Sequence, residues 1–295
     1  MDKAQRWCLA VDIGGTKLAA GLVDGSGRVL GRRQVPTPLT EDPEVVFDAL
    51  GALVDDVLRS GAEQGLAPSV CGAGCGGPMD GPDSISPLNI PAWRSFPLRS
   101  RLAQHTGLPT TLDNDAKALA LAERWCGAAA GADNFLAMVV STGVGGGIVL
   151  DGRLLDGRAG NAGHIGHVVV VPGGRRCACG GRGCLEAEAS GLSIAAVTGR
   201  HPADADIVTR RRTGRLVGRA VADVANLLDL PLAVVGGSVA LGFGEEFFGA
   251  ARRELAARAR LAFSACARIV PVGLGSDAPL VGAAAVAWRG LRSPP

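Results

Sequence analysis

The sequence lacks any long hydrophobic run. No apolar stretch among its 295 residues approaches the roughly 18–20 residues that are needed to cross a bilayer. The first residues, MDKAQRWCLAVDIGG, have neither the apolar core nor the cleavage site of a signal peptide. We therefore expect a cytoplasmic protein, in which cysteines stay reduced and available to a metal ion.

A dominant charge of one sign is also missing. The formal net charge is only +2, with 20% charged and 47% hydrophobic residues, as in an ordinary soluble globular protein. This balance predicts no nucleic-acid partner and no membrane partner. The arginine run Arg210–Arg212, with Arg215, is expected to form a solvated helix face. The Walker A pattern G-x-x-x-x-G-K-[ST] is absent as well, which excludes a nucleotide site of that type.

Glycine is abundant, with 44 residues, and the hydrophobic pattern predicts two α/β halves. The first half is expected to contain strands at 7–11, 18–23, 29–35, 69–73 and 110–112, a helix that Asp42 caps, and a helix at 98–105. The second half is expected to contain strands at 135–141, 148–150, 168–171, 233–235 and 269–272, and helices across 216–228 and 245–259. Each half has a glycine-rich turn between its first two strands, which suggests a duplicated architecture.

Three of the eight cysteines lie in one short loop. His167 is followed by Cys177, Cys179 and Cys184, and glycines separate the last two cysteines. Cys and His are the ligands that tetrahedral zinc prefers, and small glycines let a short chain fold around one ion. Four protein ligands leave no open position, so the ion would be structural. The alternative is a loop that holds thiols by chance.

The other cysteines are scattered through apolar strand and helix patterns. We expect all five to be buried small hydrophobic side chains: Cys8, Cys71, Cys75, Cys126 and Cys266.

The turn Asp12–Lys17 follows directly on a predicted strand. Its backbone amides at Gly14 and Gly15, the Thr16 hydroxyl and the adjacent carboxylate suit phosphate oxygens and a magnesium ion. An ordinary hairpin turn is the alternative. The second glycine-rich turn, at 141–147, favours the phosphate-binding interpretation.

The chain contains the residue pattern of a dinucleotide-binding motif without the features that the motif requires. Gly72, Gly74 and Gly77 form G-x-G-x-x-G after a strand, but Pro78 and Pro82 prevent the helix that this motif requires. No acidic residue lies near position 97 to bind a ribose. We therefore predict no NAD site.

The motifs together resemble those of the ROK family, which contains bacterial sugar kinases and sugar-responsive repressors. The matching segments fall in the family's order: DIGGTK at 12–17, the Asn114–Asp115 pair, STGVGGG at 141–147, GHVVVVPGGRRCACGGRGCLE at 166–186 and VVGGS at 234–238. The resemblance implies an α/β, two-lobed, actin-like (ribonuclease-H-like) ATPase fold with a nucleotide and sugar cleft between its lobes. We expect an N-terminal lobe at 1–113, with a helix near 279–291 packing back on it, and a larger C-terminal lobe at 114–295 that carries the zinc loop.

The resemblance also implies a role for individual residues. Spacing alone favours a helix cap for the Asn114–Asp115 pair. The resemblance instead makes Asp115 the catalytic base for a sugar hydroxyl and Asn114 a residue that binds the ring. The remaining sugar contacts would be Gly77, Asn89, His164, Glu186 and His167, the last of which would also bind zinc; Asn89 is also a plausible loop-turn residue. ATP and magnesium would be bound by Asp12, Gly14, Gly15, Thr16, Lys17, Thr142, Gly143 and Gly145, with Gly236 and Gly237 near the adenosine.

One departure from the family bears on the choice of sugar. Glucose-phosphorylating members usually carry Glu where this chain has His164, and the bacterial N-acetylmannosamine kinases resemble it in having His. An imidazole makes one hydrogen bond per nitrogen, whereas a carboxylate can bind two hydroxyls, so a sugar with an acyl-amino group fits the change. We expect an ATP-dependent kinase for the 6-hydroxyl of a hexose or N-acylhexosamine, with N-acetylmannosamine favoured and glucose as the alternative.

The sequence disfavours two other functions. A ROK repressor would need a DNA-binding segment, and the eleven residues before Asp12 are too few for a helix-turn-helix. A sugar-binding protein without catalysis would be expected to lack Asp115 or the loop glycines. The phosphate donor, ATP or polyphosphate, stays open, and the family resemblance leads us to expect a homodimer.

Overall fold

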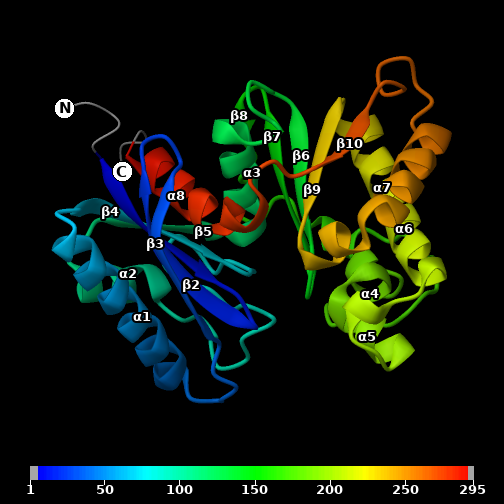
Figure 1. Cartoon of the computed structure of the whole chain (residues 1–295). Helices are drawn as coiled ribbons and strands as arrows, with labels where there is room; N and C mark the ends of the chain where they lie inside the picture. Colours follow the sequence, from blue (N-terminus) through cyan, green and yellow to red (C-terminus); the bar gives the residue numbers. More distant parts are fainter. Residues whose placement is uncertain (1–5, 292–295) are drawn as a thin grey trace. The chain divides into compact units, whose positions relative to one another are not determined.

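The computed structural model describes residues 6–291, which form two compact units (Figure 1). Among these residues, unit 1 contains 6–126, the short segment Asp156–Ala162 and 276–291. Unit 2 contains Gly127–Leu155 and Gly163–Gly275. This division differs from the predicted boundary after residue 113, because helix α3 (Asp115–Cys126) packs in unit 1 against helix α8 (Ala278–Gly290).

Unit 1 is built on a five-stranded sheet. The strand order is β3 (Val29–Pro36), β2 (Lys17–Asp24), β1 (Trp7–Ile13), β4 (Pro68–Cys75) and β5 (Thr110–Asn114). Strands β1, β4 and β5 are parallel, whereas β2 is antiparallel to both β1 and β3. A tight turn near Gly27 joins β2 to β3 as an antiparallel hairpin, and longer connections then join the parallel strands.

Helices cover both faces of this sheet. Leu9, Val11 and Ile13 face α1 (Pro43–Glu63) and α2 (Leu98–Thr106) in one core. The alternate residues Cys8 and Ala10 pack with α8 on the opposite face. Both sets are buried because successive side chains of a strand point to opposite faces, which explains the continuous apolar run in β1. The predicted cap of α1 is confirmed, since Asp42 Oδ1 accepts from the Glu44 amide at 2.9 Å.

Unit 2 repeats the pattern with a second five-stranded sheet. Its order is β10 (Arg268–Pro271), β9 (Leu232–Gly236), β6 (Phe135–Val140), β7 (Val144–Leu150) and β8 (Arg153–Leu154). The long helices α6 (Ile207–Leu228) and α7 (Ser238–Arg258) pack closely, since a Cβ on Gly214 would lie 2.2 Å from the Phe247 carbonyl oxygen. Two short helices, α4 (Leu185–Ala189) and α5 (Gly191–Thr198), follow the cysteine-rich loop.

The structure corrects several local expectations, most of them in unit 2. Only Ser141–Gly143 turn, because β7 already begins at Val144, which pairs with Val140. No strand forms at 168–171, since the amides of Val170 and Val171 both donate to the Gly183 carbonyl of the cysteine-rich loop instead of a sheet. Cys266 is exposed, not buried, because it lies in the connection between α7 and β10, and Cys126 at the end of α3 is only half-buried.

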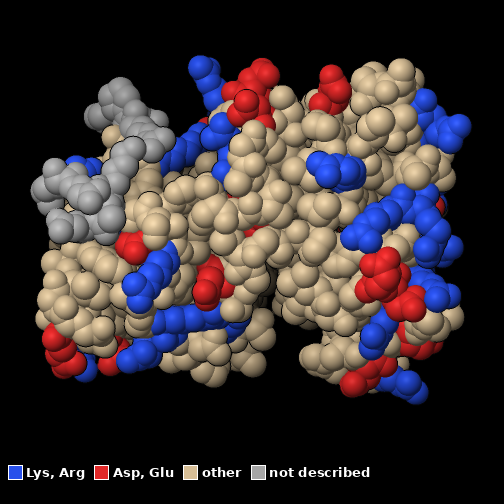
Figure 2. Space-filling view, turned by 45° about the horizontal axis from the view of Figure 1, so that its top comes forward, with Lys and Arg blue, Asp and Glu red and all other residues tan. Residues whose placement is uncertain are grey.

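No helix within residues 6–291 combines the length and the apolar character that crossing a bilayer requires. On the face shown in Figure 2, lysine and arginine side chains are interspersed with aspartate and glutamate, in line with the small net charge.

Candidate functional site

The polar residues of unit 1 meet at one edge of its sheet. In the strand register, Asp12 of β1 is paired with Gly74 of β4, and the next residue, Cys75, is paired with Asn114 of β5. These positions are the carboxyl ends of three neighbouring parallel strands, where open α/β sheets bind ligands. Asp12 and the Asn114–Asp115 pair, about 100 residues apart in sequence, are therefore brought to the same edge.

Asp115 begins α3 and is half-buried. Its Oδ1 accepts from the Ala116 amide at 2.8 Å, and Asn114 Oδ1 accepts from the same amide at 3.0 Å, so both residues do cap the helix. Burial raises the pKa of Asp115, which makes its carboxylate a better proton acceptor than an exposed one. Its second oxygen is left for other partners, so the capping role and the predicted role as a base are compatible.

The Asp12 carboxyl also has a raised pKa. Burial, followed by the negative charge of Asp115, raises its pKa to about 7, and the cations Lys17 and Arg32 act in the opposite direction. Burial and a neighbouring carboxylate both disfavour the charged form of a carboxyl group, and a nearby cation stabilises that form. Asp12 therefore suits contact with a divalent cation such as magnesium.

The Asp12–Lys17 turn is tightly held. The Gly14 amide donates to the Lys17 carbonyl at 3.0 Å, and the Thr37 hydroxyl donates to the Gly14 carbonyl at 2.6 Å. A Cβ on Gly15 would lie 2.6 Å from the Asn89 carbonyl oxygen, so only glycine permits this approach. The exposed Asn89, predicted as a sugar contact, thereby lies against the predicted phosphate turn.

Asn89 also lies against Gly76, the residue directly before the predicted sugar-binding wall at Gly77–Pro78. Its Oδ1 lies 3.1 Å from the position that a Cβ on Gly76 would take. The Gly77–Pro78 peptide is cis, and no helix begins there, as predicted from the two prolines. Unit 1 thus brings Asp12, Gly14, Gly15, Gly77 and Asn89 into one local constellation with the Asn114–Asp115 pair.

The glycine turn of unit 2 has a different kind of support. Glu186 of α4 lies against it: its Oε2 accepts from the Val144 amide at 3.0 Å and excludes any Cβ on Gly143. The Ser141 carbonyl accepts from the Gly191 amide at 2.7 Å, which ties the turn to α5. On the other side, Ser141 Oγ lies 2.9 Å from Ser238 Oγ, directly after Gly237. The predicted residues at 142–145, 186 and 236–237 are therefore neighbours within unit 2.

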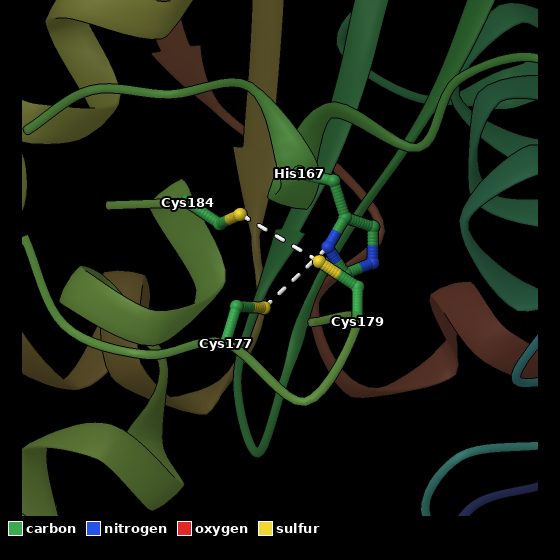
Figure 3. A group of neighbouring side chains, drawn as sticks. All are labelled: His167, Cys177, Cys179 and Cys184. Carbon is green, nitrogen blue, oxygen red and sulfur yellow. Dashed lines mark hydrogen bonds between the residues drawn. The ribbon is translucent and has the colours of Figure 1, made fainter. Parts of the chain in front are cut away.

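The four predicted zinc ligands come together in the cysteine-rich loop (Figure 3). One ligand atom of each of His167, Cys177, Cys179 and Cys184 lies within 4.8 Å of the others. Cys179 Sγ and Cys184 Sγ are 3.8 Å apart, and Cys177 Sγ is 3.7 Å from His167 Nδ1. A tetrahedral ion with Zn–S bonds of about 2.3 Å and Zn–N bonds of about 2.0–2.1 Å separates its ligands by roughly 3.6–3.8 Å. The donor set and its spacing fit a structural zinc ion.

The buried carboxylate of Glu188 links this loop to helices α4 and α6. Glu188 of α4 is 2% exposed and accepts from the Arg175 amide at 2.7 Å. It also binds the guanidinium of Arg212 at 2.5 Å, and these contacts hold its pKa below the usual range despite burial. The prediction that Arg210–Arg212 is only a solvated face is therefore wrong for Arg212, because α6 turns this side chain toward α4.

The two histidines before the loop lie next to each other. The rings of His164 and His167 are 6.0 Å apart and are inclined by 27°. Gly166 between them packs on β7, where a Cβ would lie 2.2 Å from the Val144 carbonyl oxygen. Since His167 Nδ1 faces the cysteines, its Nε2 is the ring nitrogen that is available for a second contact.

Four polar residues escaped the sequence analysis: Lys117, Asp156, Asn161 and Glu188. Lys117 is one of only three lysines in the chain, and it lies in an apolar helix two residues after Asp115. That position was a signal of a buried charge that needs partners. The other three have no comparable pattern in the sequence.

Comparison with known proteins supports the family resemblance and the fold. The sequence model of the ROK family matches residues 8–289. The N-acetylmannosamine kinase of Escherichia coli is 42% identical over 252 residues, which are 80% of this chain and 84% of that protein. The ROK glucokinase of Streptomyces griseus, solved with glucose and AMPPNP, is 33% identical with a TM-score of 0.84 over 96% of this chain and 100% of that chain. The ROK hexokinase of Thermus thermophilus is 36% identical with a TM-score of 0.78 over 97% and 99% of the two chains.

Proposed function

The chain belongs to the ROK family, and from this premise we propose that it is an ATP-dependent sugar kinase that phosphorylates the 6-hydroxyl of N-acetylmannosamine. One observation carries the proposal above all: two half-buried carboxylates, Asp12 and Asp115, share a sheet edge with a glycine turn. Phosphoryl transfer needs little more from a protein than a positioned carboxylate, aligned phosphates and a metal ion.

In the proposed reaction, Asp115 accepts the proton of the sugar 6-hydroxyl. The sugar oxygen forms its bond to the γ-phosphorus as the bond from that phosphorus to the β–γ bridging oxygen breaks, and ADP leaves with the electron pair. The raised pKa of Asp115 favours the proton transfer. Asn114, which shares the cap of α3, would orient the sugar ring.

The two glycine turns would bind the nucleotide. Backbone amides at Gly14–Lys17 and at Thr142–Gly145 are suited to phosphate oxygens, with Gly236 and Gly237 placed for the adenosine. Asp12 would hold a magnesium ion, which supplies positive charge against the phosphates. His167, Cys177, Cys179 and Cys184 would hold a structural zinc ion that braces Glu186 and the turn of unit 2. The proposal places the protein in the cytoplasm, where such thiols stay reduced.

N-acetylmannosamine is favoured over glucose on two grounds. His164 stands where a carboxylate would clasp two hydroxyls of glucose, and its imidazole suits an acyl-amino group instead. The 42% identical relative is an N-acetylmannosamine kinase. Glucose is the second candidate, because the Streptomyces griseus protein is a glucokinase.

A coupled kinase assay tests the proposal. ADP formation is measured with glucose, N-acetylmannosamine, N-acetylglucosamine, mannose, fructose and allose, and product formation is measured with polyphosphate in place of ATP. We expect N-acetylmannosamine to have the highest kcat/KM with ATP as donor. Sugar-independent ATP hydrolysis alone would contradict the kinase assignment. The homodimer expected from the family resemblance is checked by light scattering.

A further inference from the structure

A seven-residue segment of the chain leaves its neighbours in sequence. Residues Asp156–Ala162 pack in unit 1, although the chain on both sides of them belongs to unit 2. We call this segment the strap. Its polar groups contact two parts of unit 1: helix α3, which begins at Asp115, and Met79, which directly follows the wall at Gly77–Pro78.

Lys117 anchors the strap to α3. Its side chain is 3% exposed, and its ammonium group has three acceptors: Asp113 Oδ1 at 2.8 Å, Asp156 Oδ1 at 2.8 Å and the Gly160 carbonyl at 3.2 Å. An ammonium group has three donors, so all of them are used. Arg289 of α8 binds the same two carboxylates and completes the network. Because a buried charge is costly without its partners, this network has one favourable arrangement.

Asn161 joins the strap to the wall. Its Oδ1 accepts from the Met79 amide at 2.9 Å, and its Nδ2 donates to the Met79 carbonyl at 3.0 Å. Met79 is buried and directly follows the Gly77–Pro78 peptide, so the wall cannot shift without losing both bonds. Lys117 binds the Gly160 carbonyl, one residue before Asn161. A continuous path of polar contacts therefore runs from the helix of Asp115 to the wall.

We propose that the strap sets the distance between Asp115 and the Gly77–Pro78 wall, with Lys117 and Asn161 as positioning residues that determine the affinity for the sugar. The inference rests on the proposed function, since it takes Asp115 and this wall as the two sides of the sugar site. Neither positioning residue touches the sugar in this scheme. The nucleotide is bound by other residues, so its affinity should not change.

The test compares Asn161→Ala with the parent enzyme. We expect the KM for the sugar to rise about three- to tenfold, as for the loss of a hydrogen-bonded contact, with kcat and the KM for ATP each within about twofold. Asn161→Asp, which keeps the acceptor for the Met79 amide and loses the donor, should give an intermediate KM. Arg101→Met is the matched control, since it removes an ion pair with Glu44 in the same unit but away from the strap. Equal increases in both KM values, or an unchanged sugar KM in folded Asn161→Ala, would overturn the proposal.

Hydrogen exchange gives a readout that does not depend on activity. The Met79 amide should lose protection in Asn161→Ala, and also in Lys117→Met, although Lys117 does not touch Met79; Lys117→Arg should retain part of it. Arg101→Met should leave it protected. Full protection in folded Lys117→Met would refute the path through the strap. A parent enzyme that phosphorylates no sugar would defeat the proposed function alone, because the exchange data would still decide the linkage.

Discussion

The two units support their polar turns by different means. In unit 1, Asp12 lies near the end of β1 and Asp115 directly follows the end of β5, so hydrogen-bonded parallel strands of one sheet position both. In unit 2, the turn at Ser141–Gly143 is held by Glu186, which projects from a short helix that follows directly on Cys184. A regular sheet needs no further brace, whereas a glycine-rich loop of irregular backbone has little intrinsic stability. The difference indicates why thiols and a histidine gather in unit 2.

Removal of zinc should show the largest difference between the two units, because only unit 2 contains the metal cluster. We predict one zinc ion per chain in protein purified without added zinc, and a loss of several kcal/mol of stability when a chelator removes it. Hydrogen exchange should increase at the Ser141–Val144 turn and in α4, while β1 and β4 stay protected. Metal analysis by mass spectrometry gives the stoichiometry. A value near zero in folded, active protein would remove the basis for the contrast.

Asp115→Asn tests the carboxylate of unit 1. The amide keeps the size and the capping oxygen, but it cannot take up a proton at neutral pH. We expect kcat to fall by about a hundredfold or more, equivalent to about 2.7 kcal/mol of transition-state stabilisation, with a much smaller change in sugar affinity. Steady-state kinetics and sugar titration measure the two quantities. If a third of the parent turnover remained, Asp115 would be a helix cap and no more.

His164→Glu tests whether unit 2 contributes to the choice of sugar. We predict that the parent enzyme has a higher kcat/KM for N-acetylmannosamine than for glucose. The substitution should move this ratio about tenfold to a hundredfold toward glucose, the range for one hydrogen bond with an unpaired partner. Competition assays with both sugars measure the ratio directly. Equal or better use of glucose by the parent would defeat the specificity prediction and leave the kinase proposal standing.

The raised pKa of Asp12 predicts a smaller, pH-dependent effect in unit 1. Between the ordinary pKa of 3.8 and the folded-state pKa of about 7, the folded protein holds a proton that the unfolded chain has lost. The free energy of unfolding should therefore fall as pH rises through this window, by at most about 1.4 kcal/mol per pH unit for one proton, and level off above it. Asp12→Asn should flatten this dependence in denaturant titrations from about pH 5 to 8. If the free energy of unfolding depended on pH equally in variant and parent, burial would not raise the pKa of Asp12.

Features of the fold that depend on neighbouring residues were predicted better than features that depend on contacts between distant segments. Strong local signals were interpreted correctly, including the Asp42 cap and most of the apolar strands in the two halves. The strand expected at 168–171 is absent, because an apolar run says that residues are buried and not which partner their amides bind. The β7 strand extends into the glycines of 145–147, because β6 pairing and the close approach of Gly163 override the low strand preference of glycine.

The sequence alone determined the ROK resemblance, the two α/β halves and the four residues of the metal cluster, because ligand types and glycine positions are written directly in the chain. The catalytic and sugar-binding roles stay predictions. Only the tertiary structure placed Asp12 beside the Asn114–Asp115 pair, paired buried Glu188 with Arg212, and folded the strap between Lys117 and Met79. These contacts join residues 24 to more than 100 positions apart. Such pairs carry no local periodicity, and the packing of whole elements decides which charges meet.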